Sequence, residues 1–148
     1  MPQSLANVLI HLIFSTKNRE PVIRRDLSPT LHGYVVGILD NLGSPSIQTG
    51  GTCDHVHVLF SQSRTLAIAK VVEEVKKSSS KWMKGRGVGA FAWQAGYAVF
   101  SVSESQKAAA VRYIQRQEAH HRRVGFQEEM REFLVRHGVS YDERYIWD

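Results

Sequence analysis

At residues 54–60 the chain has the sequence Asp-His-Val-His-Val-Leu-Phe, in which apolar residues surround two histidines. Such a run is typical of a central β-strand. Side chains two residues apart point to the same side of a strand, so we expect His55 and His57 to project together while Val56 points into the core. The segment therefore predicts a β-sheet with a pair of imidazoles on one face.

The segments around this strand alternate between strand and helix patterns. Residues 6–16 are apolar and β-branched, whereas the apolar residues of 26–42 recur at helical spacing and are followed by Gly43 as a stop. We expect strands at residues 6–16, 45–50, 54–60 and 97–103, with Gly50-Gly51 as the turn between the second and the third. We expect helices at residues 26–42, 65–83, 104–121 and 126–137, with Ser103 as a cap and no assignment for 139–148.

This order, β-α-β-β-α-β followed by extra helices, predicts an α+β protein with a ferredoxin-like (RRM-like) fold. We expect an antiparallel sheet with helices on one face, additional C-terminal helices, and a second face that is free for a ligand or partner. The 148 residues, of which 43% are hydrophobic and 22% charged, are the size and composition of one globular domain, residues 1–148.

The sequence also excludes several classes of protein. Its longest apolar runs, such as residues 8–10 and 12–14, are too short to cross a bilayer, and its start does not resemble a secretion signal. Cys53 is the only cysteine, which rules out an intramolecular disulfide and a four-cysteine zinc site. We therefore expect a soluble, intracellular protein without membrane partners.

Basic residues outnumber acidic ones, 19 to 14, and give a net charge of +5. A positive surface attracts polyanions, most often nucleic acid. The basic residues that we select as nucleic-acid contacts lie in the helices predicted at 65–83 and 104–121; they are Lys76, Lys77, Lys81, Arg112 and Arg116. The alternative is that these clusters are ordinary solvated helix faces, and that the nearby rings of Trp82, Phe91, Trp93 and Tyr97 belong to the core instead of stacking on bases.

Two neighbouring neutral imidazoles can act together as metal ligands. Asp54 directly before them could orient or electrostatically support such a site, the alternative being that it only ends the turn. The helix predicted at 104–121 offers a third ligand, because Gln117 shares a helix face with Tyr113 and with His120 one turn further on. An amide oxygen suits hard cations such as Mg²⁺ or Mn²⁺. The alternatives are that the histidines are half-exposed polar residues and that Tyr113 is a core residue.

Five segments in this order resemble the bacterial single-tyrosine transposases of the HUH type, the small insertion-sequence and repeat-associated enzymes. The resemblance covers nearly the whole chain. Its segments are His11-Leu-Ile-Phe-Ser-Thr-Lys-Asn-Arg19, Asp54-His-Val-His-Val-Leu59, Trp93-Gln-Ala-Gly-Tyr97, Val111-Arg-Tyr-Ile-Gln-Arg-Gln117 and Tyr141-Asp-Glu-Arg-Tyr145.

The resemblance implies a DNA strand transferase that acts on single-stranded DNA with hairpins. It implies that His55, His57 and Gln117 bind a divalent metal, Mg²⁺ or Mn²⁺, and that Tyr113 attacks a phosphodiester to form a 5′-phosphotyrosine and a free 3′-hydroxyl. It further implies a homodimer, in which the tyrosine helix can complete the partner's metal site, working in the bacterial cytoplasm at the nucleoid.

Two other functions compete with this one. A non-catalytic module that binds single-stranded nucleic acid could use the same sheet, but it needs stacking aromatics in central strands. The strand rings are Phe14, Phe60 and Phe100, and they alternate as core residues do. A metal-dependent hydrolase would use a metal-bound water as nucleophile and leave Tyr113 with a structural role.

Overall fold

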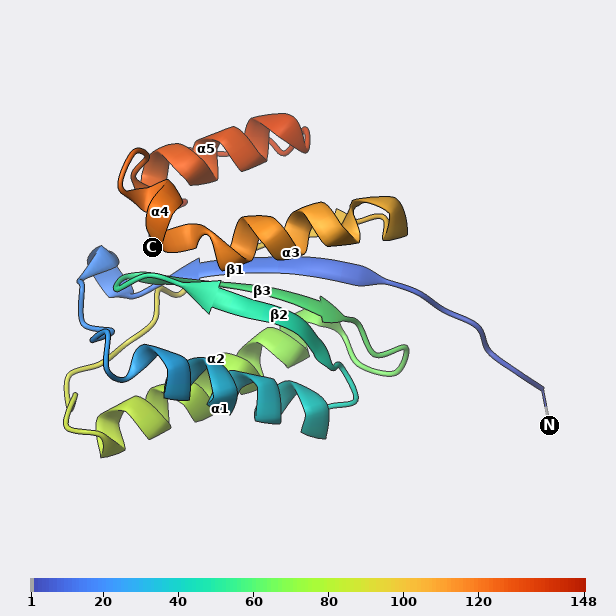
Figure 1. The fold of residues 1–148 in the computed structure, drawn as a ribbon, viewed down its shortest axis with the longest axis horizontal. Helices are drawn as coiled ribbons and strands as arrows, with labels where there is room; N and C mark the ends of the chain where they lie inside the picture. The colour runs from blue at the N-terminus through green and yellow to red at the C-terminus, as the bar shows by residue number, and fades with distance from the viewer. Residues whose placement is uncertain (1) are drawn as a thin grey trace.

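The computed structural model describes residues 2–148 and contains a four-stranded antiparallel sheet (Figure 1). Its strands are β1 (Leu9–Ser15), β2 (Ser46–Gly51), β3 (His55–Ser61) and β4 (Ala98–Val102), in the spatial order β2-β3-β1-β4. The two central strands pair so that Ile13 lies opposite His57. This strand order, with one helix after β1 and one after β3, confirms the predicted ferredoxin-like arrangement.

Helices cover both faces of the sheet (Figure 1). On one face lie α1 (Ser28–Asn41) and α2 (Ile68–Gly85), and on the other lie α3 (Lys107–Gln115), α4 (Gln117–His121) and α5 (Phe126–Arg136). Short 3₁₀ turns, η1 (Lys17–Arg19) and η2 (Glu104–Gln106), follow β1 and precede α3. None of the helices in residues 2–148 has both the length and the apolar character needed to cross a bilayer.

The main core lies between the sheet and the pair α1 and α2. Alternate residues of the central strands point into it, including Leu12, Phe14, Val56 and Val58, all of which are fully buried. Their period of two and the helical spacing of the apolar residues in α1 and α2 are the patterns that the sequence shows. The same alternation sends the intervening residues of β1 and β3 to the opposite face.

The opposite face is not free, as we expected, but is covered by α3, α4 and α5. Ile13 and Phe100 pack there against Phe133 and other apolar residues of α5, and Leu59 packs against Ile114 of α3. This expectation was wrong because the apolar stripes of the C-terminal helices need a surface to bury, and this sheet face provides it. The histidines of β1 and β3 consequently lie in a closed layer instead of on an open platform.

Two local predictions also need correction. The helix predicted over 104–121 is interrupted at Arg116, whose φ of −101° and ψ of 16° are not helical, and Ser103 makes no capping hydrogen bond. The Gly50-Gly51 pair belongs to β2, and the turn to β3 is made by residues 52–54. Gly51 pairs with Val56 and has a φ of 155°, and a β-carbon there would lie 2.2 Å from the His55 carbonyl oxygen.

The tail that the sequence left unassigned packs back onto the domain. The backbone N–H of Gly96 donates to the Asp148 carbonyl oxygen at 2.8 Å. Trp147 lies between two arginines, with the guanidinium carbon of Arg19 5.6 Å and that of Arg131 5.2 Å from the ring centroid. The tail therefore joins α5, η1 and the segment before β4.

Gly50 brings α3 close to the sheet. A β-carbon at this position would lie 2.8 Å from the backbone oxygen of Ile114 and 2.9 Å from its Cγ2 atom. Only a residue without a side chain lets the helix backbone approach β2 this closely. Because Tyr113 precedes Ile114, Gly50 also sets the distance between Tyr113 and the sheet.

We predict that Gly50→Ala destabilises the protein by about 1–3 kcal/mol, the usual cost of overpacking a well-filled contact. Urea unfolding followed by circular dichroism measures this change. The matched control is Gly37→Ala in α1, where a β-carbon meets no described atom within 4 Å and alanine stabilises a helix by about 0.5–1 kcal/mol. Equal stability of the two variants would contradict the close approach of α3.

Candidate metal and nucleophile site

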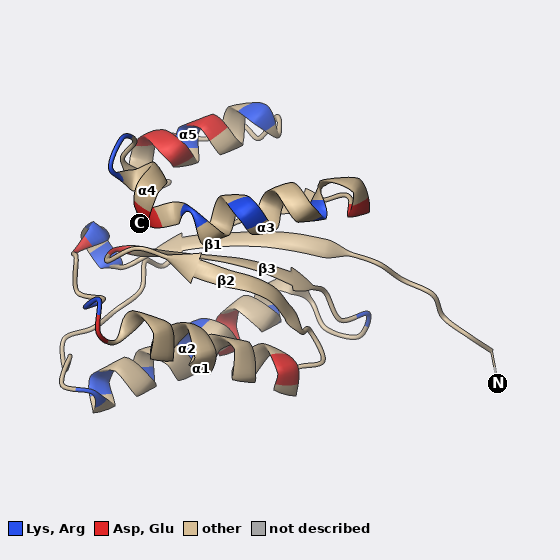
Figure 2. Ribbon diagram, viewed as in Figure 1, with Lys and Arg blue, Asp and Glu red and all other residues tan. Residues whose placement is uncertain are grey.

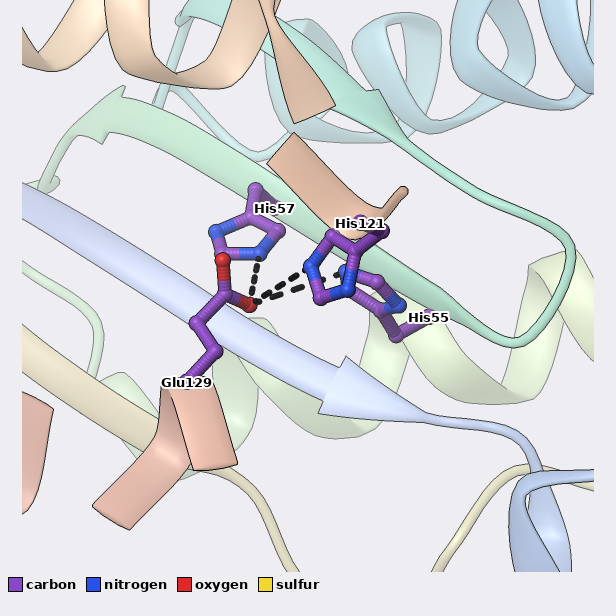
Figure 3. Close-up of side chains that lie close together, drawn as sticks. All are labelled: His55, His57, His121 and Glu129. Carbon is purple, nitrogen blue, oxygen red and sulfur yellow. Dashed lines mark hydrogen bonds and ion pairs between the residues drawn. The ribbon is translucent and has the colours of Figure 1, made fainter. Parts of the chain in front are cut away.

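His55 and His57 lie side by side on β3 and face the C-terminal helices (Figure 3). Both side chains are fully buried, and their ring centroids are 5.1 Å apart. Val56 between them belongs to the core on the other side of the sheet. The two imidazoles therefore point to the same side of the strand, as predicted. The alternative, in which both rings are half-exposed on a solvent face, was wrong.

The turn before β3 orients His55. Its Nδ1 atom lies 2.7 Å from Asp54 Oδ1 and 3.0 Å from Thr52 Oγ1. Partial burial raises the pKa of Asp54, but the hydrogen bonds with His55 and Thr52 and the charge interactions with nearby histidines together outweigh this effect and lower that pKa below its ordinary value. A carboxylate at Nδ1 holds the proton there, so the other ring nitrogen, Nε2, directs its lone pair into the layer under the helices.

His11 on β1 supports His57 in the same manner. The Nε2 atom of His11 lies 2.8 Å from Nδ1 of His57, and both rings are buried. Burial lowers the pKa of His57 to about 4 and that of His11 well below its ordinary value. Both imidazoles are therefore neutral at neutral pH, the form in which histidine binds metals.

Glu129 of α5 brings a carboxylate into this layer. Its side chain is 1% exposed, and its Oε1 atom lies 2.9 Å from His57 Nε2, 3.2 Å from His121 Nε2 and 3.7 Å from His55 Nε2 (Figure 3). Burial raises the pKa of a carboxyl group, but the contacts with His121 and His57 outweigh it and hold the pKa of Glu129 well below its usual range. The carboxylate is therefore ionised at neutral pH.

Tyr113 of α3 reaches the same carboxylate. Its hydroxyl donates a hydrogen bond to Glu129 Oε2, and its ring centroid lies 5.8 Å from that of His57. Burial and the neighbouring negative charge raise the pKa of Tyr113 above its ordinary value, so the phenol is protonated. Tyr113 is only partly buried, because it lines two cavities of about 570 and 690 Å³ on either side of α3.

Gln117 is the first residue of α4 and is 1% exposed. Its Oε1 atom lies 3.0 Å from His55 Nε2, and its Nε2 atom donates to Glu129 Oε2 at 3.2 Å. The prediction that Gln117 and Tyr113 share one continuous helix face was wrong, because the helix is interrupted at Arg116. Both side chains nevertheless converge on the histidines, since the new direction of α4 turns Gln117 towards β3.

Three further residues, His11, His121 and Glu129, belong to the site although their pattern in the sequence predicted no role for them. His121 Nε2 is buried and has no hydrogen-bond partner among residues 2–148, although it lies close to Glu129. One feature of the sequence could have pointed to Glu129. It is an acidic residue within the apolar stripe of α5, between Phe126 and Phe133. A carboxylate in such a stripe is a buried charge and needs partners.

The donor atoms present here suit a divalent metal ion. One ring nitrogen from each of His55, His57 and His121 and one oxygen of Glu129 lie within 4.8 Å of one another. Neutral imidazoles and an ionised carboxylate are the usual ligands of such ions, and His121 Nε2, which lies 3.2 Å from Glu129 Oε1 without forming a hydrogen bond, is the kind of buried atom that an ion would satisfy. The residues therefore fit the predicted metal site, with additional donors beside His55, His57 and Gln117.

The predicted nucleic-acid contacts fall on two sides of the sheet (Figure 2). Arg112 and Arg116 line the 690 Å³ cavity beside Tyr113, together with Arg122 and Arg123. The lysines Lys76, Lys77 and Lys81 are on α2, in the layer opposite the histidines. Lys76 is already engaged there, because its ammonium group donates to the carbonyl oxygen of Gln94 at 2.8 Å and to that of Gly96.

The candidate stacking rings are mostly structural. Phe91 and Trp93 are buried in the core, where the Trp93 indole donates to Ser79 Oγ at 2.9 Å. Trp82 stacks on Tyr34, at a centroid distance of 5.6 Å. Tyr97 is the one ring of the four that is exposed.

Comparison with known proteins places this chain in one family. Residues 4–117 match the family described as IS200-like transposases. The ISDra2 transposase TnpA of Deinococcus radiodurans is 29% identical over 114 residues, an alignment that covers 72% of this chain and 81% of that protein.

Solved structures share the fold. A protein of Deinococcus radiodurans R1 that has been assigned as a transposase superposes with a TM-score of 0.62 and 24% identity, covering 79% of this chain and 98% of that one. A REP-associated tyrosine transposase bound to a REP hairpin gives a TM-score of 0.62 at 12% identity, covering 95% of this chain and 87% of that one. The chain therefore belongs to the IS200-like transposases, and the predicted resemblance to single-tyrosine HUH enzymes is confirmed.

Proposed function

We propose that this transposase cuts and rejoins single-stranded DNA with hairpin ends through a covalent bond between Tyr113 and a 5′-phosphate. The observation that carries the proposal is the position of the Tyr113 hydroxyl, which is joined to the histidine cluster through Glu129 and lies next to an arginine-lined cavity. A REP-associated relative was solved with a REP hairpin, which supports hairpin DNA as the substrate.

In the proposed reaction the Tyr113 oxygen attacks the phosphorus of a phosphodiester. A bond between Tyr113 and the 5′-phosphate forms while the bond to the 3′-oxygen breaks, and the proton lost by the phenol is balanced by the one gained by the new 3′-hydroxyl. The covalent link conserves a phosphate ester bond, so the reverse attack by a 3′-hydroxyl rejoins DNA without ATP.

His55, His57 and the side-chain oxygen of Gln117 would hold a divalent ion, Mg²⁺ or Mn²⁺. When bound, such an ion polarises a non-bridging phosphate oxygen and offsets the charge that develops during attack. Asp54 fixes the orientation of His55, and His11 fixes that of His57. These hydrogen bonds keep both rings directed at the same point, which a metal ligand set requires.

The cavity beside Tyr113 offers a path for the DNA strand. Arg112, Arg116, Arg122 and Arg123 line it with Tyr113, so phosphates on both sides of the cleaved bond could be held there. Lys77 and Lys81 lie on the opposite layer and would contact DNA only away from the cleaved bond. Lys76 would contribute less, because its ammonium group is bound by backbone carbonyl oxygens.

We further propose that the active site is completed within one chain. Tyr113, Gln117 and the two histidines of β3 already meet in a single copy of the protein. A homodimer, which the family resemblance implies, would then pair two complete sites for cutting two DNA ends.

Tyr113→Phe is expected to abolish the covalent protein–DNA product while leaving DNA affinity within about threefold, or about 0.6 kcal/mol. The assay incubates protein, hairpin-bearing single-stranded DNA and Mn²⁺, and looks for a mass increase on a denaturing gel. Tyr97→Phe, which changes an exposed tyrosine outside the site, is the control. Adduct formation by the Tyr113→Phe variant would refute the nucleophile, and DNA binding without any adduct by the unaltered protein would favour a non-catalytic module.

His57→Ala is expected to remove the stabilisation of the DNA-free protein by Mn²⁺. An ion that binds only the folded state at one hundred times its Kd stabilises by about 2.7 kcal/mol, which a thermal melt resolves. His32→Ala, on α1, is the control because His32 is outside the site. An equal rise in Tm with Mn²⁺ for the wild type and the His57→Ala variant would exclude His57 as a ligand.

Arg112→Ala and Arg116→Ala are each expected to weaken binding of single-stranded DNA and to flatten its dependence on salt. Each lost phosphate contact reduces the slope of log K against log salt by about 0.7 for single strands. Fluorescence anisotropy between low and moderate salt measures this slope, with Arg64→Ala, in the exposed loop before α2, as the control. Unchanged slopes in both variants would show that the DNA takes another path.

A further inference from the structure

The helix α5 lies outside residues 4–117, the part of the chain that matches the family, yet it places Glu129 at the centre of the site. We propose that Glu129 is a further metal ligand through Oε1 and, through Oε2, a positioning residue for Tyr113 and Gln117. This inference rests on the proposed function, because it assumes that a divalent ion binds at His55 and His57.

The burial of Glu129 needs an explanation of its own. Its side chain is 1% exposed and sits among Phe126, Met130 and Phe133 on the inward stripe of α5. Burying an ionised carboxylate costs several kcal/mol unless close partners compensate. A leucine or methionine would fill the same space without this cost. Packing alone therefore does not explain a carboxylate here, whereas a function that needs its negative charge does.

The Oε1 atom has the spacing of a metal ligand. It lies 2.9, 3.2 and 3.7 Å from the Nε2 atoms of His57, His121 and His55. Ligand atoms bound at about 2.0–2.2 Å from one ion lie about 3.0–3.5 Å from each other, depending on the coordination angle. The three distances from Oε1 lie within about 0.2 Å of this range, so the Glu129 oxygen is spaced from each histidine nitrogen much as two ligands of one ion are.

The hydrogen bonds around His55 also favour a cation at this point. Because Asp54 holds the proton on Nδ1, Nε2 presents a lone pair, and two oxygens face it, Gln117 Oε1 at 3.0 Å and Glu129 Oε1 at 3.7 Å. Three electron-rich atoms that face one another repel unless a positive charge lies between them. A divalent ion removes this repulsion.

The Oε2 atom faces the other way and fixes two neighbours. It accepts hydrogen bonds from the Tyr113 hydroxyl and from Gln117 Nε2, the latter at 3.2 Å. An amide that donates to Glu129 must turn its carbonyl oxygen away from it, and this points Gln117 Oε1 at His55. One carboxylate thereby sets the direction of a metal ligand and the position of the nucleophile.

The decisive variant is Glu129→Gln, which keeps the size of the side chain but removes its charge. We expect its affinity for Mn²⁺, measured without DNA by titration calorimetry and by the electron paramagnetic resonance signal of free Mn²⁺, to fall at least about tenfold. At Mn²⁺ concentrations that saturate the variant, covalent adduct formation should still be slower than in the wild type, because the amide holds Tyr113 less firmly. Glu128→Gln, an exposed neighbour on the same helix, is the matched control and should change neither quantity.

Wild-type affinity for Mn²⁺ in the Glu129→Gln variant would overturn the ligand assignment, and a wild-type adduct rate at saturation would overturn the positioning role. A lower Tm without a change in either quantity would show a structural role only, which also overturns the inference. Should Glu129→Gln not fold, Glu129→Asp retains the charge on a shorter side chain and must bind Mn²⁺ more weakly. These outcomes are distinct from failure of the proposed function, in which His57→Ala binds Mn²⁺ normally or Tyr113→Phe still forms the adduct.

Discussion

An ionised carboxylate can be removed from water only where several polar partners surround it, and this constraint organises the second face of the sheet. Glu129 on α5 meets partners on three other elements: His57 on β3, Tyr113 on α3, and Gln117 and His121 on α4. Each element must therefore dock correctly for the charge to be accommodated. Docking of the C-terminal helices and assembly of the site are consequently linked, because misplacement of any of these elements removes part of the compensation for the buried charge.

The sequence predicts the elements better than it predicts their junctions. Alternation in residues 54–60 predicted β3 and the shared direction of His55 and His57, and helical spacing predicted α1, α2 and α5 to within a few residues. The interruption at Arg116 and the extension of β2 through Gly51 were missed, because they depend on contacts with distant segments and not on local preference. Site prediction shows the same division: Tyr113 and Gln117 follow from the family motif, whereas Glu129 enters the site only because α5 packs across the sheet.

The family match covers residues 4–117, which contain the sheet and the helices α1, α2 and α3. The residues after Gln117 are added to this part of the fold. They supply α4, α5 and a tail that returns to Gly96 through the Asp148 carbonyl group. Together with α3 they cover this sheet face, and burial there keeps the imidazoles of His11 and His57 neutral. A closed layer strengthens electrostatic contacts within it, since the local dielectric constant is lower than that of water.

The close contact at Gly50 has a consequence for how such enzymes diversify. There the backbone of the helix that carries Tyr113 lies so close to the strand that a β-carbon on Gly50 would meet both the carbonyl oxygen and the Cγ2 atom of Ile114. Backbone geometry changes little when side chains are exchanged. The distance from the sheet to the Tyr113 hydroxyl therefore depends little on substitutions elsewhere on the surface. The side chains that line the neighbouring arginine-rich cavity can then be exchanged while the position of the Tyr113 ring relative to the sheet is kept.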